Sequence, residues 1–467
     1  MIANKTNTLS ELSSPSPPPS PLEEGVVMSL RGSETTEAIL QDIDRQEIAT
    51  LPSVARNDKK GMMTQSFGGE GKGEGWKKIR FAIGLLDFSK KKGGAERYLV
   101  DLCTRMAAEG YEVHVYAEHR DEEDPNICFH SVKTIPFPKS LRLLSFAIRA
   151  TKEIEHGKYD ITFGVGNTLK ADILQPHGGV HWAWFWRSLK IYNHAILWAI
   201  KFLGRIFSLK QWASGWIQDA PYKGKNFSKI IAISDMVKQD LLHWYPIPEE
   251  RIAVVYNGVD IEHFHPRNRQ YREEIRRRHG IGKEEWVLLF VSNNFRMKGL
   301  NFLMKALANI KKGGHPPFKL LILGRDRQGS YLRLAREIGI SKEVVFAGST
   351  NEPEKYYGAS DLLIHPTFYD ACSLTVLEAL ASGLPVITTH SNGASGIITQ
   401  GQEGFIVSDP RDIQTLVEKI TFFLNSEKAM RVSNAARHLA ESHSLERNWR
   451  EIKNIFQNYL SGGMAKE

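Results

Sequence analysis

Between residues 77 and 460, short apolar runs alternate with longer amphipathic segments. Compact apolar runs such as 79–86 and 386–389 predict buried strands. Segments with apolar positions three or four residues apart, such as 96–108, predict helices that cover those strands. Strands and helices that alternate in this way predict an α/β protein with parallel sheets.

The strand–helix pattern occurs twice, with a charge-rich stretch at 267–280 between the two series. It predicts two doubly wound, Rossmann-like domains that face each other across a cleft. We expect the first domain to span residues 77–266 and the second residues 267–440. Residues 441–467 are expected to form a C-terminal helix that packs back on the first domain.

Residues 1–76 lack this pattern and are predicted to form a disordered N-terminal tail. The tail contains SSPSPPPSP at 13–21 and GGEGKGEG at 68–75, with few aromatic residues to bury. The glycine-rich stretch could be taken for a phosphate-binding loop. No strand precedes it, however, and we therefore interpret it as a linker.

Composition narrows the class of protein and of partner. The 467 residues are 42% hydrophobic and 24% charged, which is typical of a globular protein. A net charge of +8 favours anionic partners. Three well-separated cysteines indicate neither a disulfide framework nor a metal-ligand cluster. Because we find no apolar run of spanning length and no signal-peptide pattern, we expect a cytoplasmic protein.

The richest stretch is 361–389, which predicts a strand, a polar loop, a helix at Leu374–Ala381 and a second strand. Ligands of such units bind at the carboxyl ends of the strands. Two acids need an explanation there: Asp370 in the loop and Glu378 inside the apolar helix. Either Glu378 forms a structural salt bridge, or both acids hold hydroxyl groups of a ligand while the helix start at 373–375 binds an anion.

In the first predicted domain, Gly93 and Gly94 lie between the first strand and the first helix. The dinucleotide fingerprint G-x-G-x-x-G is absent. Bare backbone at this point would allow a bulky ligand to approach the helix. Alternatively, at least one of the two glycines is needed for a turn with positive φ.

Tryptophan is concentrated in residues 181–216, which hold six of the ten tryptophans together with five lysines and arginines. The tryptophans are Trp182, Trp184, Trp186, Trp198, Trp212 and Trp216, and the cations are Arg187, Lys190, Lys201, Arg205 and Lys210. One interpretation is a pair of helices whose tryptophans belong to the core. The other is an amphipathic surface that meets anionic lipid.

The spacing of Asp370 and Glu378, followed by Ala-x-Ala-x-Gly-x-Pro-Val, resembles the E-x7-E signature of retaining family 4 glycosyltransferases with the GT-B fold. Here an aspartate replaces the first glutamate. Further stretches extend the resemblance over nearly all of 77–460: GGAERYLVDLCTRMAAEGYEVHVYA, IIAISDMVKQDL, VVYNGVD, FRMKGLNFLMKAL and LILGRD. They are most similar to the lipopolysaccharide core glucosyltransferase I branch.

The resemblance implies a nucleotide-sugar donor, with a UDP-sugar favoured, bound mainly by the second domain. It also implies an acceptor bound mainly by the first domain, and no metal or other cofactor. Lys298 and Arg296 would neutralise the diphosphate. Asp370 would hold donor-sugar hydroxyls, and Glu378 the ribose.

In the first domain, Gly94 would let the chain approach the donor phosphate. His177 resembles the histidine that touches the donor sugar near its anomeric carbon, although an ordinary buried histidine is the alternative. The expected catalytic residues are His177, Lys298 and Asp370. The expected donor-binding residues are Gly93, Gly94, Arg296, Lys298, Gly324, Asp370, Cys372, Ser373, Leu374, Thr375 and Glu378.

We therefore expect a retaining hexosyltransferase, most simply a glucosyltransferase, with a glycan or glycolipid acceptor such as lipopolysaccharide core. In the implied reaction the departing diphosphate helps to accept the acceptor proton, so no paired-carboxylate nucleophile is needed. The alternative is an inactive sugar-nucleotide or glycan binding protein of the same fold. Nucleic acid is not an expected partner. Lipid binding by 181–216 would place the protein peripherally on the inner face of the cytoplasmic membrane.

Overall fold

The computed structural model describes residues 78–91 and 93–464. The predicted tail at 1–76 lies outside these residues. The described chain forms two parallel sheets with helices around them, so the predicted fold class is confirmed. We call each sheet with its own helices a half of the molecule.

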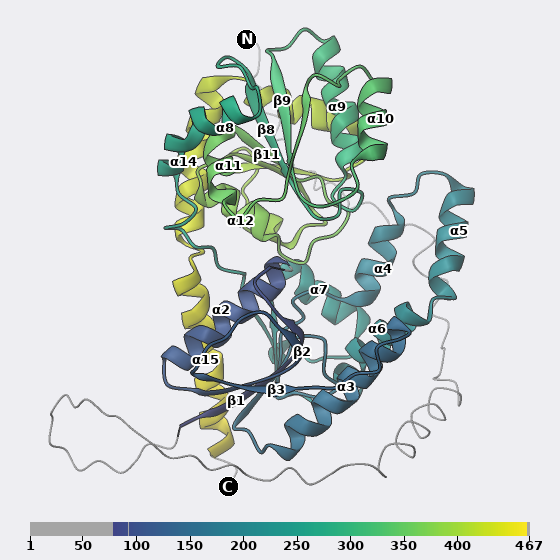
Figure 1. Cartoon of the computed structure of the whole chain (residues 1–467), viewed down its shortest axis with the longest axis vertical. Helices are drawn as coiled ribbons and strands as arrows, with labels where there is room; N and C mark the ends of the chain where they lie inside the picture. The colour runs from purple at the N-terminus through teal and green to yellow at the C-terminus, as the bar shows by residue number, and fades with distance from the viewer. Residues whose placement is uncertain (1–77, 92, 465–467) are drawn as a thin grey trace, which may run out of the picture. The chain divides into compact units, whose positions relative to one another are not determined.

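The sheet of the first half has seven strands in the order β3-β2-β1-β4-β5-β6-β7. All of its neighbouring strands pair in parallel. Their bounds are β1 Arg80–Phe88, β2 Glu112–Arg120, β3 Ile127–Ser131, β4 Ile161–Gly164, β5 Ile173–Leu174, β6 Lys229–Ala232 and β7 Ile252–Val254. The apolar run predicted at 79–86 is β1, and its centre is buried because helices cover both faces of the sheet (Figure 1).

Helices connect these strands, as parallel pairing requires. They are α2 Gly94–Ala108, α3 Lys139–His156, α4 His181–Leu189, α5 Ala195–Ile206, α6 Leu209–Lys223 and α7 Asp235–Trp244. The amphipathic helix expected at 96–108 is α2. The tryptophan-rich segment forms three helices, α4 to α6, and not the pair that the sequence suggested.

The sheet of the second half has six parallel strands in the order β10-β9-β8-β11-β12-β13. They are β8 Trp286–Val291, β9 Phe318–Leu323, β10 Val344–Gly348, β11 Leu362–Ile364, β12 Val386–Thr389 and β13 Gly404–Val407. The first six strands of the first half follow the same 3-2-1-4-5-6 order, which is that of doubly wound nucleotide-binding sheets.

The helices of the second half are α8 Arg272–Arg278, α9 Leu300–Lys312, α10 Gly329–Glu337, α11 Pro353–Ala359, α12 Leu374–Ala381, α13 Ile413–Phe423 and α14 Ser426–Glu441. Short 3-10 turns occupy Glu249–Arg251, Pro266–Tyr271 and Gly393–Ile397. Helix α12 has the bounds that its apolar positions predicted.

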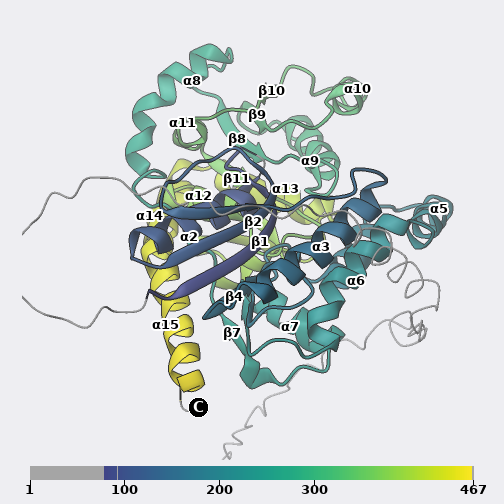
Figure 2. The same ribbon diagram turned by 60° about the horizontal axis from the view of Figure 1, so that its bottom comes forward.

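The last helix, α15 (Leu445–Met464), leaves the second half and packs on the first (Figures 1 and 2). Its Ile452 and Phe456 are fully buried in one core with Phe81 of β1. The Tyr98 hydroxyl of α2 donates to the Asn448 carboxamide at 3.0 Å. The end of the chain thus completes the hydrophobic core of the first half.

Two features of the first half differ from expectation. The sequence analysis did not predict β3 and α3. Strand β3, at the edge of the sheet, is short and only partly apolar. The turn at Gly93 and Gly94 needs no positive φ: Gly93 is extended at φ −170°, and Gly94 is the first residue of α2. The positive-φ explanation of these glycines is therefore wrong.

Candidate active site

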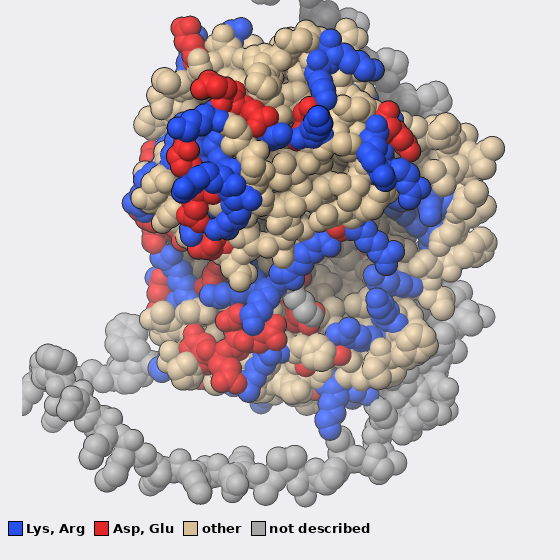
Figure 3. Space-filling model, turned by 45° about the horizontal axis from the view of Figure 1, so that its top comes forward, with Lys and Arg blue, Asp and Glu red and all other residues tan. Residues whose placement is uncertain are grey.

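The carboxyl-terminal edges of the two sheets meet through one loop of the second half, residues 366–373 between β11 and α12. The Ser234 hydroxyl, which also caps α7, donates to the Ala371 carbonyl at 2.7 Å. The Asn257 amide donates to the Cys372 carbonyl at 3.1 Å. These bonds hold the loop against the first half. Figure 3 shows a face that is hollowed near its centre, with lysine and arginine side chains around the hollow.

The centre of this loop is an ion pair between Lys298 and Asp370. The Lys298 ammonium lies 2.5 Å from Asp370 Oδ2 and also donates to the Tyr369 carbonyl at 3.1 Å. The ring of His365 reaches the same carboxylate oxygen at 3.3 Å. Burial alone would raise the pKa of Asp370, but the Lys298 charge and the His365 hydrogen bond outweigh it and hold this pKa well below its usual range. Asp370 is therefore ionised at neutral pH.

The turn that carries Lys298 packs directly on the loop that carries Asp370. The Phe368 amide donates to the Met297 carbonyl at 2.9 Å. Gly299 has φ +75°, and a Cβ at this position would lie 2.2 Å from the Pro366 carbonyl oxygen. Only glycine fits here, so this residue lets the two loops approach closely enough for the ion pair.

Arg296 is separated from this pair. It is exposed, and its guanidinium lies 6.0 Å from the ring centre of Tyr192 in the first half. The buried side chain of Met297 stands between the two cations in sequence and turns inward. Of the two predicted diphosphate ligands, the structure joins only Lys298 to Asp370.

Glu378 lies on α12 and is half-buried. Its Oε2 accepts a hydrogen bond from the Tyr357 hydroxyl at 2.7 Å. Burial raises the pKa of Glu378, and the Tyr357 hydrogen bond offsets this only in part. Within the described chain no lysine, arginine or histidine lies at ion-pair distance from it. The structural salt bridge that was the alternative explanation is therefore not found there.

The start of α12 provides fewer free amides than its sequence suggested. The Ser373 amide donates to the Asn392 carboxamide at 3.2 Å, so it is not available to an anion. Within the described residues, the amides of Leu374 and Thr375 have no protein acceptor. The Ser373 side chain makes no capping hydrogen bond. Two open amides at a helix N-terminus remain suited to an anion.

Gly94 faces α12 from the first half. A Cβ on Gly94 would lie 2.9 Å from Leu374 Cδ1, so the missing side chain allows α2 and α12 to approach. A Cβ on Gly93 would meet only the side chain of Glu96 on its own helix. Gly324 has φ +140°, and a Cβ there would lie 1.6 Å from the Ser292 carbonyl oxygen. Sheet geometry alone therefore demands glycine at 324.

His177 follows β5 in the first half and is buried. Its ring stacks on Tyr98, with centres 4.7 Å apart and planes 25° apart. Its Nδ1 is buried without a hydrogen-bond partner among the described residues. Burial lowers the pKa of His177 to about 4, and the negative charge of Asp370 offsets this in part. The ring is neutral at pH 7. Its Nδ1 shares the lack of a partner with one buried ring nitrogen each of His181 and His365, so the ordinary buried histidine stays the alternative.

Cys372 takes part in the site through its backbone carbonyl, and its thiol stays protonated. Its side chain is buried, and burial raises the pKa of the thiol to about 12. Its carbonyl is the acceptor of Asn257 described above.

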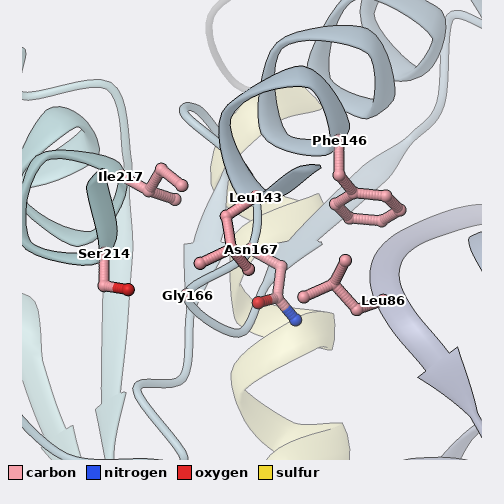
Figure 4. Close-up of a pocket in the computed structure, with 7 residues that line it drawn as sticks. All are labelled: Leu86, Leu143, Phe146, Gly166, Asn167, Ser214 and Ile217. Carbon is pink, nitrogen blue, oxygen red and sulfur yellow. The ribbon is translucent and has the colours of Figure 1, made fainter. Parts of the chain in front are cut away.

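A small cavity of about 70 Å³ lies at the same edge of the first sheet as His177. Figure 4 shows its lining: Leu86, Leu143, Phe146, Gly166, Asn167, Ser214 and Ile217. The side chains of Asn167 and Ser214 have no hydrogen-bond partner within the described chain. Apolar walls with two open polar groups suit a small amphipathic group, such as part of a sugar ring.

The helices α4 to α6 are neither a closed core nor uniformly exposed. Among their six tryptophans, Trp212 is exposed and the other five are partly buried. Helix α5, at the outer edge of the first half in Figures 1 and 2, has no buried residue. Its exposed apolar residues are Ile196, Leu197, Ile200 and Leu203, with Phe207 and Leu209 beyond it. Exposure reaches 79% at Ile196.

Two of the cations between the tryptophans are used within the protein. Arg187 forms a two-pronged ion pair with Asp240, with both contacts at 2.6 Å. Arg205 donates to the Phe185 carbonyl at 3.0 Å and to the Ser188 hydroxyl at 2.6 Å. Lys190, Lys201 and Lys210 are exposed. Within the described part of the chain, no helix is long and apolar enough to cross a bilayer.

Sequence reasoning did not assign a role to His365, Tyr357, Asn257, Asn392 or Tyr369. The residue His365 was visible only as the end of a strand. The other four form the cited hydrogen bonds with residues 19 to 189 positions away, so no local pattern marks them.

Comparison with known proteins identifies the class. The model of Glycosyltransferase Family 4 matches residues 92–263, and that of Glycosyl transferases group 1 matches residues 271–439. Together they cover the whole second sheet and the first sheet from β2 to β7, whereas β1 lies before the first match. The chain therefore contains a Glycosyltransferase Family 4 domain followed by a Glycosyl transferases group 1 domain.

Curated relatives refine this assignment. The chain is 26% identical to the lipopolysaccharide glucosyltransferase WaaG of Escherichia coli (strain K12) over 370 residues, which is 76% of this chain and 92% of that protein. It is 29% identical to a D-inositol 3-phosphate glycosyltransferase of Corynebacterium kroppenstedtii over 251 residues, 51% of this chain and 55% of that protein. The match to this second relative therefore covers only about half of each of the two proteins.

Solved structures agree on the fold. The crystal structure of WaaG superposes with a TM-score of 0.67 at 22% identity and covers 80% of this chain and 99% of its own. That of Anabaena HepE in complex with UDP and glucose superposes with a TM-score of 0.58 at 16% identity, covering 81% and 99%. The similarity to these structures concerns the arrangement of the two sheets.

Proposed function

We propose that this chain is a retaining glycosyltransferase that transfers glucose from a UDP-sugar to a glycan or glycolipid acceptor such as lipopolysaccharide core. The observation that carries the proposal is the Lys298–Asp370 pair at the meeting edges of the two sheets. A charged pair in such a place is costly unless it meets a ligand or is fully satisfied. The name of the relative WaaG, and the UDP and UDP-glucose in the HepE structures, motivate the choice of donor and acceptor.

In this proposal, the second half binds the donor. An ammonium has three N–H donors, and two of those of Lys298 are used by Asp370 and the Tyr369 carbonyl. The third is available to a diphosphate oxygen, with Arg296 and the open amides of Leu374 and Thr375 as further anion donors. Glu378 would accept hydrogen bonds from the ribose hydroxyls through the oxygen that Tyr357 does not occupy.

The sugar would lie between Asp370 and His177. The ionised Asp370 accepts hydrogen bonds from sugar hydroxyls, and neutral His177 offers its unused Nδ1 near the reacting carbon. Retention would follow from attack on the face that the diphosphate leaves, with a phosphate oxygen taking the acceptor proton. Positioning and charge stabilisation are then the protein's contribution. Neither a metal nor another cofactor is part of this proposal.

The first half would bind the acceptor and the membrane. The cavity beside Asn167 and Ser214 supports an acceptor group at the edge that carries His177. The exposed apolar face of α5, flanked by Lys201 and Lys210, supports a peripheral position on anionic lipid, where a lipid-linked acceptor is found. Such a position is on the cytoplasmic face of the inner membrane.

The test is turnover. The full chain is incubated with UDP-glucose and, as acceptor, lipopolysaccharide core that lacks the glucose to be added, in buffer with and without EDTA. We expect glucose transfer with retained anomeric configuration by NMR, unchanged by EDTA. Binding of UDP-glucose without transfer or hydrolysis would instead support the inactive binding protein.

A further inference from the structure

Tyr369 connects the two halves at the proposed site. It directly precedes Asp370 in the loop of the second half, and its ring is only 4% exposed. The side chain reaches into the first half, where its hydroxyl accepts a hydrogen bond from the Val180 amide at 3.0 Å. Val180 is the residue before α4.

The first half is shaped to receive this hydroxyl. Gly179 has φ +78°, and a Cβ there would lie 1.9 Å from the Tyr369 hydroxyl oxygen. The turn around Gly179 is held on both sides: its amide donates to the Pro176 carbonyl at 2.8 Å, and its carbonyl accepts from the Gln218 amide at 2.8 Å. Any side chain at 179 would displace the phenol.

The ring of Tyr369 is also held from the side. The Arg187 guanidinium lies 5.5 Å from the ring centre, within the range of a cation–π contact. Asp240 fixes this guanidinium with two hydrogen bonds. The tyrosine therefore has one defined position in the first half.

The same residue contacts both parts of the proposed reaction centre. Its carbonyl accepts from Lys298, whose ammonium also binds Asp370. Its hydroxyl accepts from Val180 at the end of the turn at 176–180, which contains His177. A shift of this phenol would therefore change the separation between His177 and the Lys298–Asp370 pair.

We propose that Tyr369 is a positioning residue that sets the distance between the donor-binding acid–lysine pair and His177. It acts through the turn at 176–180 and does not itself touch the substrate. This inference rests on the proposed function, since it assigns a role within that reaction.

The first test is Tyr369→Phe, which removes the acceptor of a buried amide. Turnover of UDP-glucose should fall at least about tenfold, because the turn at 176–180 loses a hydrogen bond that holds it and His177 is then misplaced relative to the sugar. KM for UDP-glucose should change by less than about twofold, because the donor-binding groups remain. Exchange of the Val180 amide, followed by NMR, should become at least about tenfold faster.

The control is Tyr116→Phe. Tyr116 is also 4% exposed, and the change removes one hydrogen bond, between its hydroxyl and that of Tyr159 at 2.7 Å. It lies on β2, away from the loop at 366–373. This variant should leave both kcat and the Val180 exchange rate unchanged. If Tyr369→Phe and Tyr116→Phe lower kcat equally, Tyr369 only stabilises the fold and the inference is wrong.

A second variant, Gly179→Ala, tests the close contact between Gly179 and the Tyr369 hydroxyl. Alone it should lower kcat more than Tyr369→Phe, because the new methyl overlaps the phenolic oxygen. In the double variant the oxygen is absent and the nearest ring atom is 2.9 Å away, so the two effects should combine to less than their product. Independent, multiplying effects would overturn the proposal.

The outcomes separate this inference from the proposed function. A wild-type chain that neither transfers nor hydrolyses glucose from UDP-glucose disproves the function, and the positioning role falls with it. Normal wild-type turnover that Tyr369→Phe leaves unchanged disproves the positioning role alone.

Discussion

The two halves of the molecule share the order of their first six strands but differ in the groups that they place at the strand ends. The edge of the second half is charged, with the Lys298–Asp370 pair and the carboxylate of Glu378. In the first half, the groups that could meet a sugar are neutral: His177 is uncharged, and the small cavity is lined by apolar groups, an amide and a hydroxyl. Charge is present at this edge further along, at Lys90 and Lys91 after β1.

This difference teaches that a doubly wound sheet fixes where a ligand binds, whereas the loops fix its chemistry. Charge at one edge suits an anionic nucleotide sugar. The neutral groups of the first half, His177 and the cavity lining, together with the exposed apolar helix α5, suit a sugar that is carried on a lipid. Four sets of substitutions test this division of roles.

Lys298→Ala should lower transfer by at least about a hundredfold, because it removes a charge that stabilises the departing diphosphate. It also leaves the buried Asp370 without its main partner. Transfer is measured at saturating UDP-glucose. The control Lys305→Ala removes an exposed lysine of α9 and should have no effect. Near-normal turnover of Lys298→Ala would show that Lys298 does not stabilise the departing diphosphate.

Glu378→Gln should weaken UDP-glucose binding roughly thirtyfold, the scale of a lost charge-assisted hydrogen bond. Because burial raises the pKa of Glu378, ionisation of this group disfavours folding above its unfolded-state pKa. The neutral variant should therefore keep or raise the melting temperature at pH 7. Calorimetry and thermal unfolding measure both, with the exposed Glu337→Gln as control. Unchanged affinity with a collapsed melting temperature would make Glu378 purely structural.

Lys201→Glu combined with Lys210→Glu should weaken binding to anionic vesicles at least about tenfold, since each cation near such a surface contributes about 1 kcal/mol. We choose these two because Arg205 is bound within the protein, and its reversal would disrupt the contact between α4 and α5. Co-sedimentation at low and high salt gives the measurement, with Lys305→Glu as control. Binding that is absent, or indifferent to salt and to these changes, would exclude lipid docking through α5.

His177→Gln should alter the pH dependence of stability more than stability at pH 7.5. Burial lowers the pKa of His177 to about 4, against about 6.5 for an unfolded histidine. Between these values the unfolded chain binds more protons, so wild-type stability falls as pH falls from about 6.5 towards 4. The variant loses the share of this slope that comes from His177, whereas His365 and His181, whose pKa values burial also lowers, keep theirs. The exposed His315→Gln keeps the whole slope. If stability depended on pH equally in wild type, His177→Gln and His315→Gln, burial would not be keeping His177 neutral.

Much of the second half could be predicted from local pattern. Helix α12 and strand β12 have the predicted bounds, because their apolar positions are continuous and glycine and proline end the helix. The spacing of Asp370 and Glu378 marked both acids as candidate site residues, and both lie in the loop–helix unit where the two halves meet. Gly94 and Gly324 lie where the chain approaches another element closely, whereas a Cβ at Gly93 would meet only the Glu96 side chain. The donor-binding role of these glycines stays a prediction.

The sequence alone determined that this chain forms two parallel sheets and that its unusual acids lie at a strand end, because periodicity records which side chains are buried. Tertiary structure decided the partners. Lys298 meets Asp370 72 positions away, Val180 meets Tyr369 189 positions away, and Arg205 turns from a surface cation into a donor for Phe185. Such contacts depend on how loops from different strands meet, and burial patterns along the chain carry no record of that meeting.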